Sequence, residues 1–185
     1  MVIDSQSQSL LKNIQNKFDS VQTLKSEFVQ EVKLAGQSKP TSISGTFFYK
    51  KKNHYRIELN SRHIISDGES VWNYDKGMGK VIITPVDDDP LSFSLYRYIM
   101  QYPNYCSVES ELKNELKLEP NSDELELEYI KIWCDNNFII KKVEVMDYSK
   151  NIYSFTFGSV DIEKQISDSV FLFSPPKGIK VIDLR

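Results

Sequence analysis

The chain has 185 residues, of which 12% are aromatic, and it carries a net charge of −3 at pH 7. This length suits one domain spanning residues 1–185, which would bury about 70% of the surface that the unfolded chain exposes. Without a basic excess the chain has no electrostatic footprint for nucleic acid, so that class of partner is not expected. No apolar run is long enough to cross a membrane as a helix.

The first residues lack the marks of an export signal. Met1 to Gln6 has neither the basic start nor the apolar core that such a signal requires. The protein is therefore either cytosolic or exported with a leader removed, and the residues leave both open.

An amphipathic helix is predicted at residues 10–21. Apolar side chains recur there at intervals of three and four, at Leu10, Leu11, Ile14, Phe18 and Val21. Ser7 or Ser9 is the expected N-cap. A helix with one apolar stripe needs a surface to lie on.

Alternation of apolar and polar residues replaces the helical period from residue 24 onward. Residues 24–34 read as a strand with one face in water. Further strands are predicted at residues 44–50, 55–59, 63–66, 71–75, 80–84, 105–108, 116–118, 124–134, 138–147, 152–157 and 179–184. The clearest turn between them is Asp67-Gly68, since both residues tolerate the positive φ of a tight hairpin.

Consecutive hairpins of this kind predict an antiparallel sheet of about eleven strands. Sheets of that width twist and tend to curl. Only the first helix and a second helical segment at residues 91–100 are available to cover the concave face. Two short helices would not fill it, so an apolar cavity is expected.

No catalytic or metal-binding motif appears in the chain, and we expect neither an enzyme nor a cofactor. His54 and His63 are read as ordinary strand residues, and Asp87-Asp88-Asp89 as a solvated loop without the spacing of a calcium site. Cys106 and Cys134 match no zinc or redox spacing. They are either buried thiols or, in an exported protein, a disulfide.

Aromatic residues dominate the first half of the predicted sheet. They are Phe28, Phe47, Tyr49, Tyr55, Trp72 and Tyr74. Pattern alone favours a packed core over a ligand-lining role for them.

Three segments, in order, resemble the periplasmic outer-membrane lipoprotein carrier family, LolA. The first comprises Phe28-x-Gln30, Gly45-x-Phe47-x-Tyr49-Lys50-Lys51 and Tyr55-Arg56-Ile57. The second is Ser66-Asp67-Gly68-x-x-Val71-Trp72-x-Tyr74-Asp75. The third is Phe171-x-Phe173-x-Pro175-Pro176-x-Gly178-x-x-Val181-Ile182-Asp183. Leu118-x-Pro120 and Asp147-x-x-x-Asn151 also match.

The resemblance implies a mainly β, incomplete and strongly curved barrel, closed by short helices around a hydrophobic cavity. It implies a monomeric, periplasmic carrier that takes acylated lipoproteins from an inner-membrane ABC transporter complex to an outer-membrane lipoprotein receptor. The residues expected to line its cavity are Phe28, Phe47, Tyr55, Ile57, Leu59, Trp72, Tyr74, Leu91 and Leu95.

One departure concerns the closing helices. The family has Arg-Pro after the second strand, and that arginine tethers the lid, whereas this chain has Lys51-Lys52. Lysine keeps the charge but not the planar fork of donors. Lys51 is the expected lid latch, with Lys50 or Arg56 as substitutes.

Two other functions fit the same residues. One is a periplasmic sensor of lipids or lipoproteins that regulates a partner, and the other is an enzyme acting on lipids. A receptor of the same fold is disfavoured, because no cysteine begins the chain for acylation.

Overall fold

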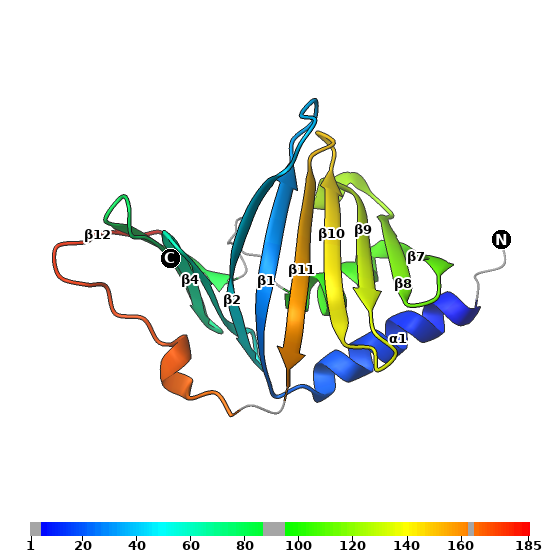
Figure 1. Ribbon diagram of the computed structural model, residues 1–185, viewed down its shortest axis with the longest axis horizontal. Coiled ribbons are helices and arrows are strands. Elements are labelled where there is room, and N and C mark those ends of the chain that lie inside the picture. Colours follow the sequence, from blue (N-terminus) through cyan, green and yellow to red (C-terminus); the bar gives the residue numbers. More distant parts are fainter. Residues whose placement is uncertain (1–4, 87–94, 163–164) are drawn as a thin grey trace. The chain divides into compact units, whose positions relative to one another are not determined.

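The computed structural model describes residues 5–86, 95–162 and 165–185 (Figure 1). The described helices are α1 (Ser5–Ser20), the π-helical turn η2 (Arg97–Gln101) and the 3₁₀ turns η3 (Tyr102–Tyr105), η4 (Asp123–Leu125) and η5 (Asp168–Phe171). The described strands are β1 (Thr23–Lys33), β2 (Thr41–Lys50), β3 (His54–Leu59), β4 (Arg62–Asp67), β5 (Ser70–Asp75), β6 (Lys80–Pro85), β7 (Cys106–Leu112), β8 (Glu115–Pro120), β9 (Leu127–Cys134), β10 (Ile140–Asp147), β11 (Ile152–Asp161) and β12 (Lys180–Asp183).

The predicted first helix is present, and it is longer than its apolar stripe. Ile14 is fully buried and Phe18 nearly so, as the three- and four-residue spacing predicts. The helix already includes Ser7 and Ser9, so the predicted N-cap is wrong. Nothing among the Ser and Gln residues of this stretch breaks a helix, and the first turns therefore continue upstream of Leu10.

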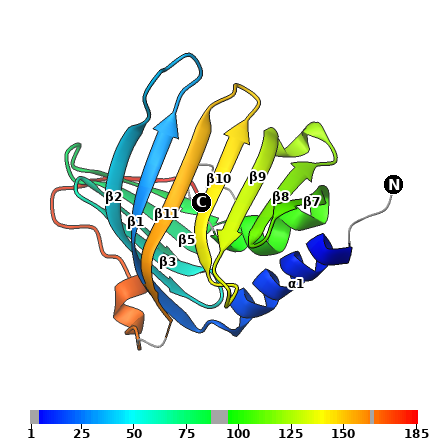
Figure 2. The same ribbon diagram turned by 45° about the vertical axis from the view of Figure 1, so that its right-hand side comes forward.

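The described strands form one open sheet. Their order is β12-β6-β5-β4-β3-β2-β1-β11-β10-β9-β8-β7, with β12 and β7 at the two edges. Figure 2 shows β11, β10, β9, β8 and β7 side by side in this order. The mainly β fold class and the unclosed sheet agree with the sequence prediction. The structure has twelve strands in the described residues, against the predicted number of about eleven.

One pairing departs from the predicted antiparallel order. β12 lies parallel to β6, with Val181 beside Val81. A tight hairpin can join only antiparallel neighbours, whereas a long intervening chain allows either direction. The residues between β6 and β12 make up such a chain, so hairpin signals could not predict this edge.

The hairpin at Asp67-Gly68 forms where the sequence predicts it. β4 and β5 are joined through Gly68 and Glu69, and Gly68 has a φ of 92°. Asp67 contributes through its side chain, because its Oδ1 accepts the backbone N–H of Glu69 at 3.0 Å and of Ser70 at 2.9 Å. Turn chemistry of this kind sets the strand register that follows.

The chain groups into two compact units. In the described residues, the first comprises residues 5–20, 28–43 and 95–158, and the second comprises residues 21–27, 44–86, 159–162 and 165–185. The first unit contains α1, η2 and β7 to β10, and the second contains β3 to β6, η5 and β12. A single domain over residues 1–185 stays a prediction.

Within residues 5–86, 95–162 and 165–185, none of the helices is long and apolar enough to cross a membrane.

Candidate functional site

Strands β2 to β6 of the second unit present two faces with different residues. Directly paired residues in a sheet point to the same side, so the registers assign each side chain to a face. We call one side the Tyr55 face; it holds Phe47, Tyr49, Tyr55, Ile57, Leu59, Ile64, Ser66 and Val71. We call the other the Trp72 face; it holds Phe48, His54, Arg56, His63, Ile65, Trp72, Tyr74, Val81 and Ile83.

The Tyr55 face brings together four of the predicted cavity residues. Phe47 pairs with Ile57 across β2 and β3, and Tyr55 lies two residues along β3 on the same side. These three side chains are 2–4% exposed, while Leu59 is half-buried at the end of the strand. They form one continuous apolar surface.

Two predicted residues lie on the other face. Trp72 pairs with Ile65, and Tyr74 pairs with His63. Ile65 pairs in turn with Arg56, which alternates with Tyr55 and Ile57 along β3. The structure therefore does not bring Trp72 and Tyr74 together with Tyr55 and Ile57.

A C-terminal segment covers the Trp72 face. We call residues 167–173, which include η5, the strap. Phe171 of the strap is 1% exposed and packs edge-on against His54, with ring centres 6.0 Å apart. Phe173 packs against Tyr74 at 5.4 Å. The strap gives the aromatic residues of this face a packing partner within the same unit.

Two cationic side chains of the sheet bind the strap. Arg56 Nη1 donates to the carbonyl of Val170 at 3.2 Å, and its Nε donates to Glu58 at 2.7 Å. Lys50 forms an ion pair with Asp168, which lowers the pKa of that carboxyl. The sequence suggested both cations as substitute lid latches, and the contacts described here join them to the strap.

The turn that carries Lys51 differs from the Arg-Pro turn of the resembled family. Lys52 and Asn53 have φ values of 70° and 61°. Proline at position 52 is incompatible with this turn, because its ring holds φ near −65°. The backbone N–H of Lys51 donates to the carbonyl of Gln22 at 2.9 Å, which fastens the turn to the start of β1. A latch role for the Lys51 side chain stays a prediction.

Residues Ser66-Asp67-Gly68 support that turn. Ser66 is fully buried, and its Oγ donates to the carbonyl of Asn53 at 3.0 Å and accepts the N–H of Gly68 at 3.1 Å. A Cβ on Gly68 would stand 2.7 Å from the carbonyl oxygen of Lys52. This motif of the resemblance thus has a structural explanation, since it locks two neighbouring hairpins together.

The remaining predicted lining residues lie elsewhere in the chain. Phe28 is 5% exposed on β1. Leu95 is 3% exposed, just before η2 in the first unit. Leu91 and the Asp87-Asp88-Asp89 run fall outside the described residues.

The first unit has an apolar sheet face of its own. Leu116 and Leu118 of β8, Ile130 and Ile132 of β9 and Val143 of β10 are fully buried and share one side by register. α1 contacts β7, β8 and η2. Burial raises the pKa of Tyr98 in η2, and its neighbours Tyr102 and Tyr153 raise it further. Tyr153 pairs with Val145 and therefore lies on the apolar side of the sheet, near Tyr98 of η2.

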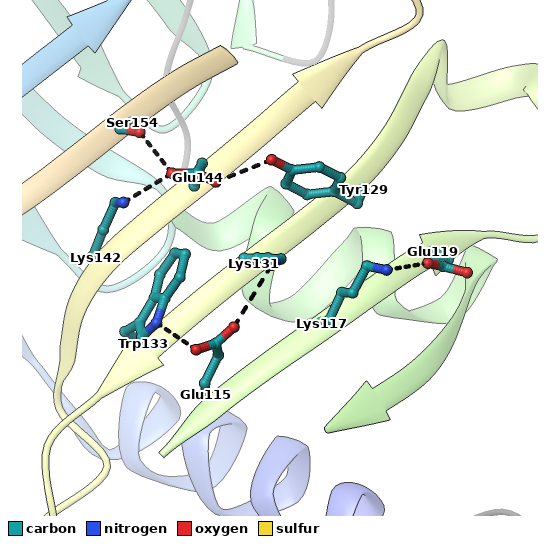
Figure 3. A network of polar contacts seen from close by, with 9 residues as sticks. All are labelled: Glu115, Lys117, Glu119, Tyr129, Lys131, Trp133, Lys142, Glu144 and Ser154. Atoms are coloured by element: carbon teal, nitrogen blue, oxygen red, sulfur yellow. Dashed lines mark hydrogen bonds and ion pairs between the residues drawn. The ribbon is translucent and has the colours of Figure 1, made fainter. Parts of the chain in front are cut away.

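The opposite side of that sheet carries a set of polar contacts, and Figure 3 marks their hydrogen bonds and ion pairs. Trp133 Nε1 donates to Glu115 at 2.8 Å, and Lys142 lies 4.5 Å from the Trp133 ring centre. Lys142 also donates to Glu144 at 2.8 Å, as does Tyr129 at 3.0 Å. Lys131 closes the ring between Tyr129 and Glu115.

Glu144 shows what the network does for a partly buried charge. Burial opposes its ionisation, but hydrogen bonds from Lys142, Tyr129 and Ser154 outweigh burial and lower its pKa. Sequence reasoning missed this network. The alternation of charged and aromatic residues in β8, β9 and β10 was its only signal, and the partners depend on register.

The cysteines lie beside opposite ends of β8. Cys106 pairs with Pro120, while the backbone N–H of Cys134 donates to the carbonyl of Asn114. The six residues of β8 separate these points by roughly 20 Å, far beyond the reach of a disulfide. Burial raises the pKa of both thiols to about 11. Of the two alternatives, the structure supports buried free thiols.

The histidines are also separated by register. His54 pairs with Asp67 and His63 pairs with Glu58, so the two histidines lie four positions apart along β3, or roughly 13 Å. Across the described part of the chain, no cluster of three or more His, Cys, Asp or Glu side chains could hold a metal ion.

Comparison with known proteins identifies relatives over most of the chain. The family model described as "Outer membrane lipoprotein carrier protein LolA" matches residues 19–174. Outer-membrane lipoprotein carrier proteins of Francisella tularensis subsp. novicida and Haemophilus influenzae are each 24% identical; the alignments cover 91% and 93% of this chain and 85% and 86% of theirs.

Solved structures show the fold alone. An uncharacterized conserved protein from Thermus thermophilus superposes with a TM-score of 0.60 at 11% identity, covering 97% of this chain and 99% of the other. A LolA superfamily protein from Nitrosomonas europaea superposes with a TM-score of 0.50 at 9% identity, covering 90% and 97%.

Proposed function

The chain belongs to the outer membrane lipoprotein carrier protein LolA family, and from that membership we propose that it is a periplasmic carrier for the acyl chains of lipoproteins. It receives these lipoproteins after their release from the inner membrane and delivers them to an outer-membrane receptor. Its partners are then an inner-membrane ABC transporter complex and a receptor lipoprotein. It acts by binding rather than by catalysis.

The Tyr55 face is the observation that carries this proposal. Phe47, Tyr55 and Ile57 make one apolar surface on adjacent strands, and their register places them side by side. Saturated chains need such a surface and no directed polar group. In this proposal the sheet is strongly curved, and the acyl chains lie in the hollow on its Tyr55 face. The aromatic pair Trp72 and Tyr74 belongs to the strap side and makes no contact with cargo.

The free energy of transferring acyl chains out of water limits how completely the carrier can bury them. Moving one 16-carbon chain out of water stabilises the bound state by about 13 kcal/mol, at about 0.8 kcal/mol for each methylene. Three such chains would exceed the practical affinity limit of about 18–21 kcal/mol. A carrier that releases its cargo therefore buries the chains partially. Because bilayer and cavity are similarly apolar, an ATP-driven partner supplies the work of extraction.

A charge on the Tyr55 face tests the proposal. Ile57→Glu would place a carboxylate against the acyl chains, where an unpaired charge is strongly unfavourable. A synthetic triacylated lipopeptide with a fluorescent label serves as the probe, and binding is followed by anisotropy. We expect binding to the unchanged protein and a loss of at least about tenfold in the variant, whose fold is checked by circular dichroism.

Phe48→Glu is the matched control on the Trp72 face. Phe48 is half-buried on the strand beside β3, and Lys25 Nζ lies 5.3 Å from its ring centre, so a carboxylate there gains a cation partner. Lipopeptide binding should survive this change. Equal losses in both variants, or undiminished binding by a folded Ile57→Glu protein, would remove the Tyr55 face from the proposal.

A transfer assay separates carrier from sensor. Vesicles containing the transporter complex load the protein, and loaded protein is then mixed with receptor. A carrier passes labelled lipoprotein to the receptor, whereas a regulatory binding protein retains it. Turnover of labelled lipid in the same mixture would instead identify an enzyme.

A further inference from the structure

In the first unit, one hydrogen bond joins α1 to η2 close to the proline of η3. Gln15 Nε2 of α1 donates to the carbonyl of Ile99 at 3.0 Å. In an α-helix that carbonyl would accept the N–H of the residue four positions later. That residue is Pro103, which has no N–H to donate.

The surrounding geometry shows a helix that has adapted to this loss. The N–H of Tyr102 donates to the carbonyl of Arg97, five residues back, which is the wider π-helical spacing. Asn104 makes a similar bond at the next position, where its side-chain amide donates to the carbonyl of Met100 at 3.2 Å. Side-chain amides therefore bind the carbonyls of both Ile99 and Met100.

The bond lies in a partly buried setting. Ile99 is fully buried, as is Ile14, which precedes Gln15 in α1. A carbonyl left unsatisfied in such a place costs free energy comparable to a lost hydrogen bond, so the contact is favoured over an open alternative. Asn16, the neighbouring amide, is exposed.

We propose that Gln15 is a positioning residue that makes α1 and η2 move as one cover over the apolar face of β8 and β9. The proposal rests on the carrier function, for which this cover must open and close. Pro103 creates the need for the bond by withholding its N–H, and Gln15 supplies it. The coupling then comes from a side chain on α1 itself and does not depend on a cation at position 51.

The proposal predicts that the effect of a substitution at Gln15 depends on the residue at position 103. Gln15→Met keeps the length of the side chain and removes the donor. Pro103→Ala supplies an N–H to η2, so the carbonyl of Ile99 no longer depends on Gln15. Hydrogen exchange, read by mass spectrometry on peptides covering residues 5–20 and 95–106, reports the opening of each element.

We expect Gln15→Met to raise exchange about three- to tenfold in both peptides, the effect of one hydrogen bond. Asn16→Met should change neither peptide. In the Pro103→Ala background, Gln15→Met should have little effect. Faster exchange in α1 alone, no change in either peptide, or the same increase in both backgrounds would each overturn the coupling.

Release of the labelled lipopeptide gives the functional arm. Gln15→Met should release it about three- to tenfold faster, and the Pro103→Ala double variant should restore the original rate. If the unchanged protein binds no lipopeptide, the carrier function fails while the exchange data still decide the coupling. If it binds lipopeptide and Gln15→Met leaves both exchange and release unaltered, the coupling fails and the carrier function stands.

Discussion

The two faces of strands β2 to β6 use aromatic residues for different ends. On the Trp72 face the strap packs against two rings of the sheet, with Phe171 against His54 and Phe173 against Tyr74. On the Tyr55 face Phe47, Tyr55 and Ile57 form a continuous apolar surface on adjacent strands. We propose that the same strands carry a structural side and a ligand-binding side. The Trp72 face packs against the strap of its own unit, and the Tyr55 face is the proposed binding side.

Removing the cover from the Trp72 face should have the largest effect. Phe171→Ala deletes a side chain that is 1% exposed, and such truncations cost about 3–5 kcal/mol. We expect a loss of that size in the free energy of unfolding by urea. Lipopeptide affinity per folded molecule should stay within about twofold, because the cargo occupies the other face. A variant that keeps full stability would show that the strap is not a structural cover.

A substitution in the hairpin turn at Gly68 should have the next largest effect. Gly68→Ala forces a side chain into a φ of 92° and places its Cβ against the carbonyl of Lys52. A left-handed conformation costs roughly 1–2 kcal/mol for an ordinary residue, and the close contact adds to it. We expect a loss of about 2 kcal/mol or more in chemical unfolding. Gly36→Ala shares the positive φ but has open space around it, so a smaller loss there isolates the contact.

The sequence predicts most strands of this sheet. It also predicts the face of Tyr55 and Ile57, but not the face of Trp72. Alternation in residues 55–59 places Tyr55 and Ile57 on one side, and the structure agrees. Alternation alone could not predict which residues of β5 share the face of Tyr55 and Ile57. That depends on the loop through Gly68 and Glu69, whose length pairs Ser66 with Val71 and sends Trp72 to the opposite face.

The strap and the polar network were beyond sequence reasoning for a different reason. Arg56 and Val170 are 114 positions apart, and no local period connects them. Likewise, Trp133 meets Glu115 and Lys142 only because β8, β9 and β10 take one register out of several. Local chemistry predicts elements and turns, whereas these contacts require the assembled sheet.

Enlarging one buried residue on each face tests whether the Tyr55 face borders free space. Ile65→Phe adds volume to a fully buried position on the Trp72 face, where overpacking costs about 1–3 kcal/mol. If the proposed hollow borders the Tyr55 face, Ile57→Phe should cost less than about 1 kcal/mol, because the ring can extend into that space, and it should weaken lipopeptide binding. Thermal and urea unfolding give both free energies. Equal costs on the two faces would mean that both are packed cores.

The smallest expected effects come from Arg56→Met and Lys51→Met, which distinguish a contact to the strap from a lid latch. Arg56→Met keeps the aliphatic stem and loses the bond to the carbonyl of Val170, which is worth about 1 kcal/mol. Hydrogen exchange should rise in residues 165–173, while exchange in α1 should stay unchanged.

Lys51→Met is the companion variant: a lid latch at that position predicts faster lipopeptide release with no change in the strap. If Lys51→Met alters neither release nor the exchange of α1, position 51 has lost the role that arginine has in the family, and the cover depends on contacts within α1 and η2 instead. If Arg56→Met speeds release as strongly as Lys51→Met, the two faces are not independent, and the division between a structural side and a binding side has to be abandoned.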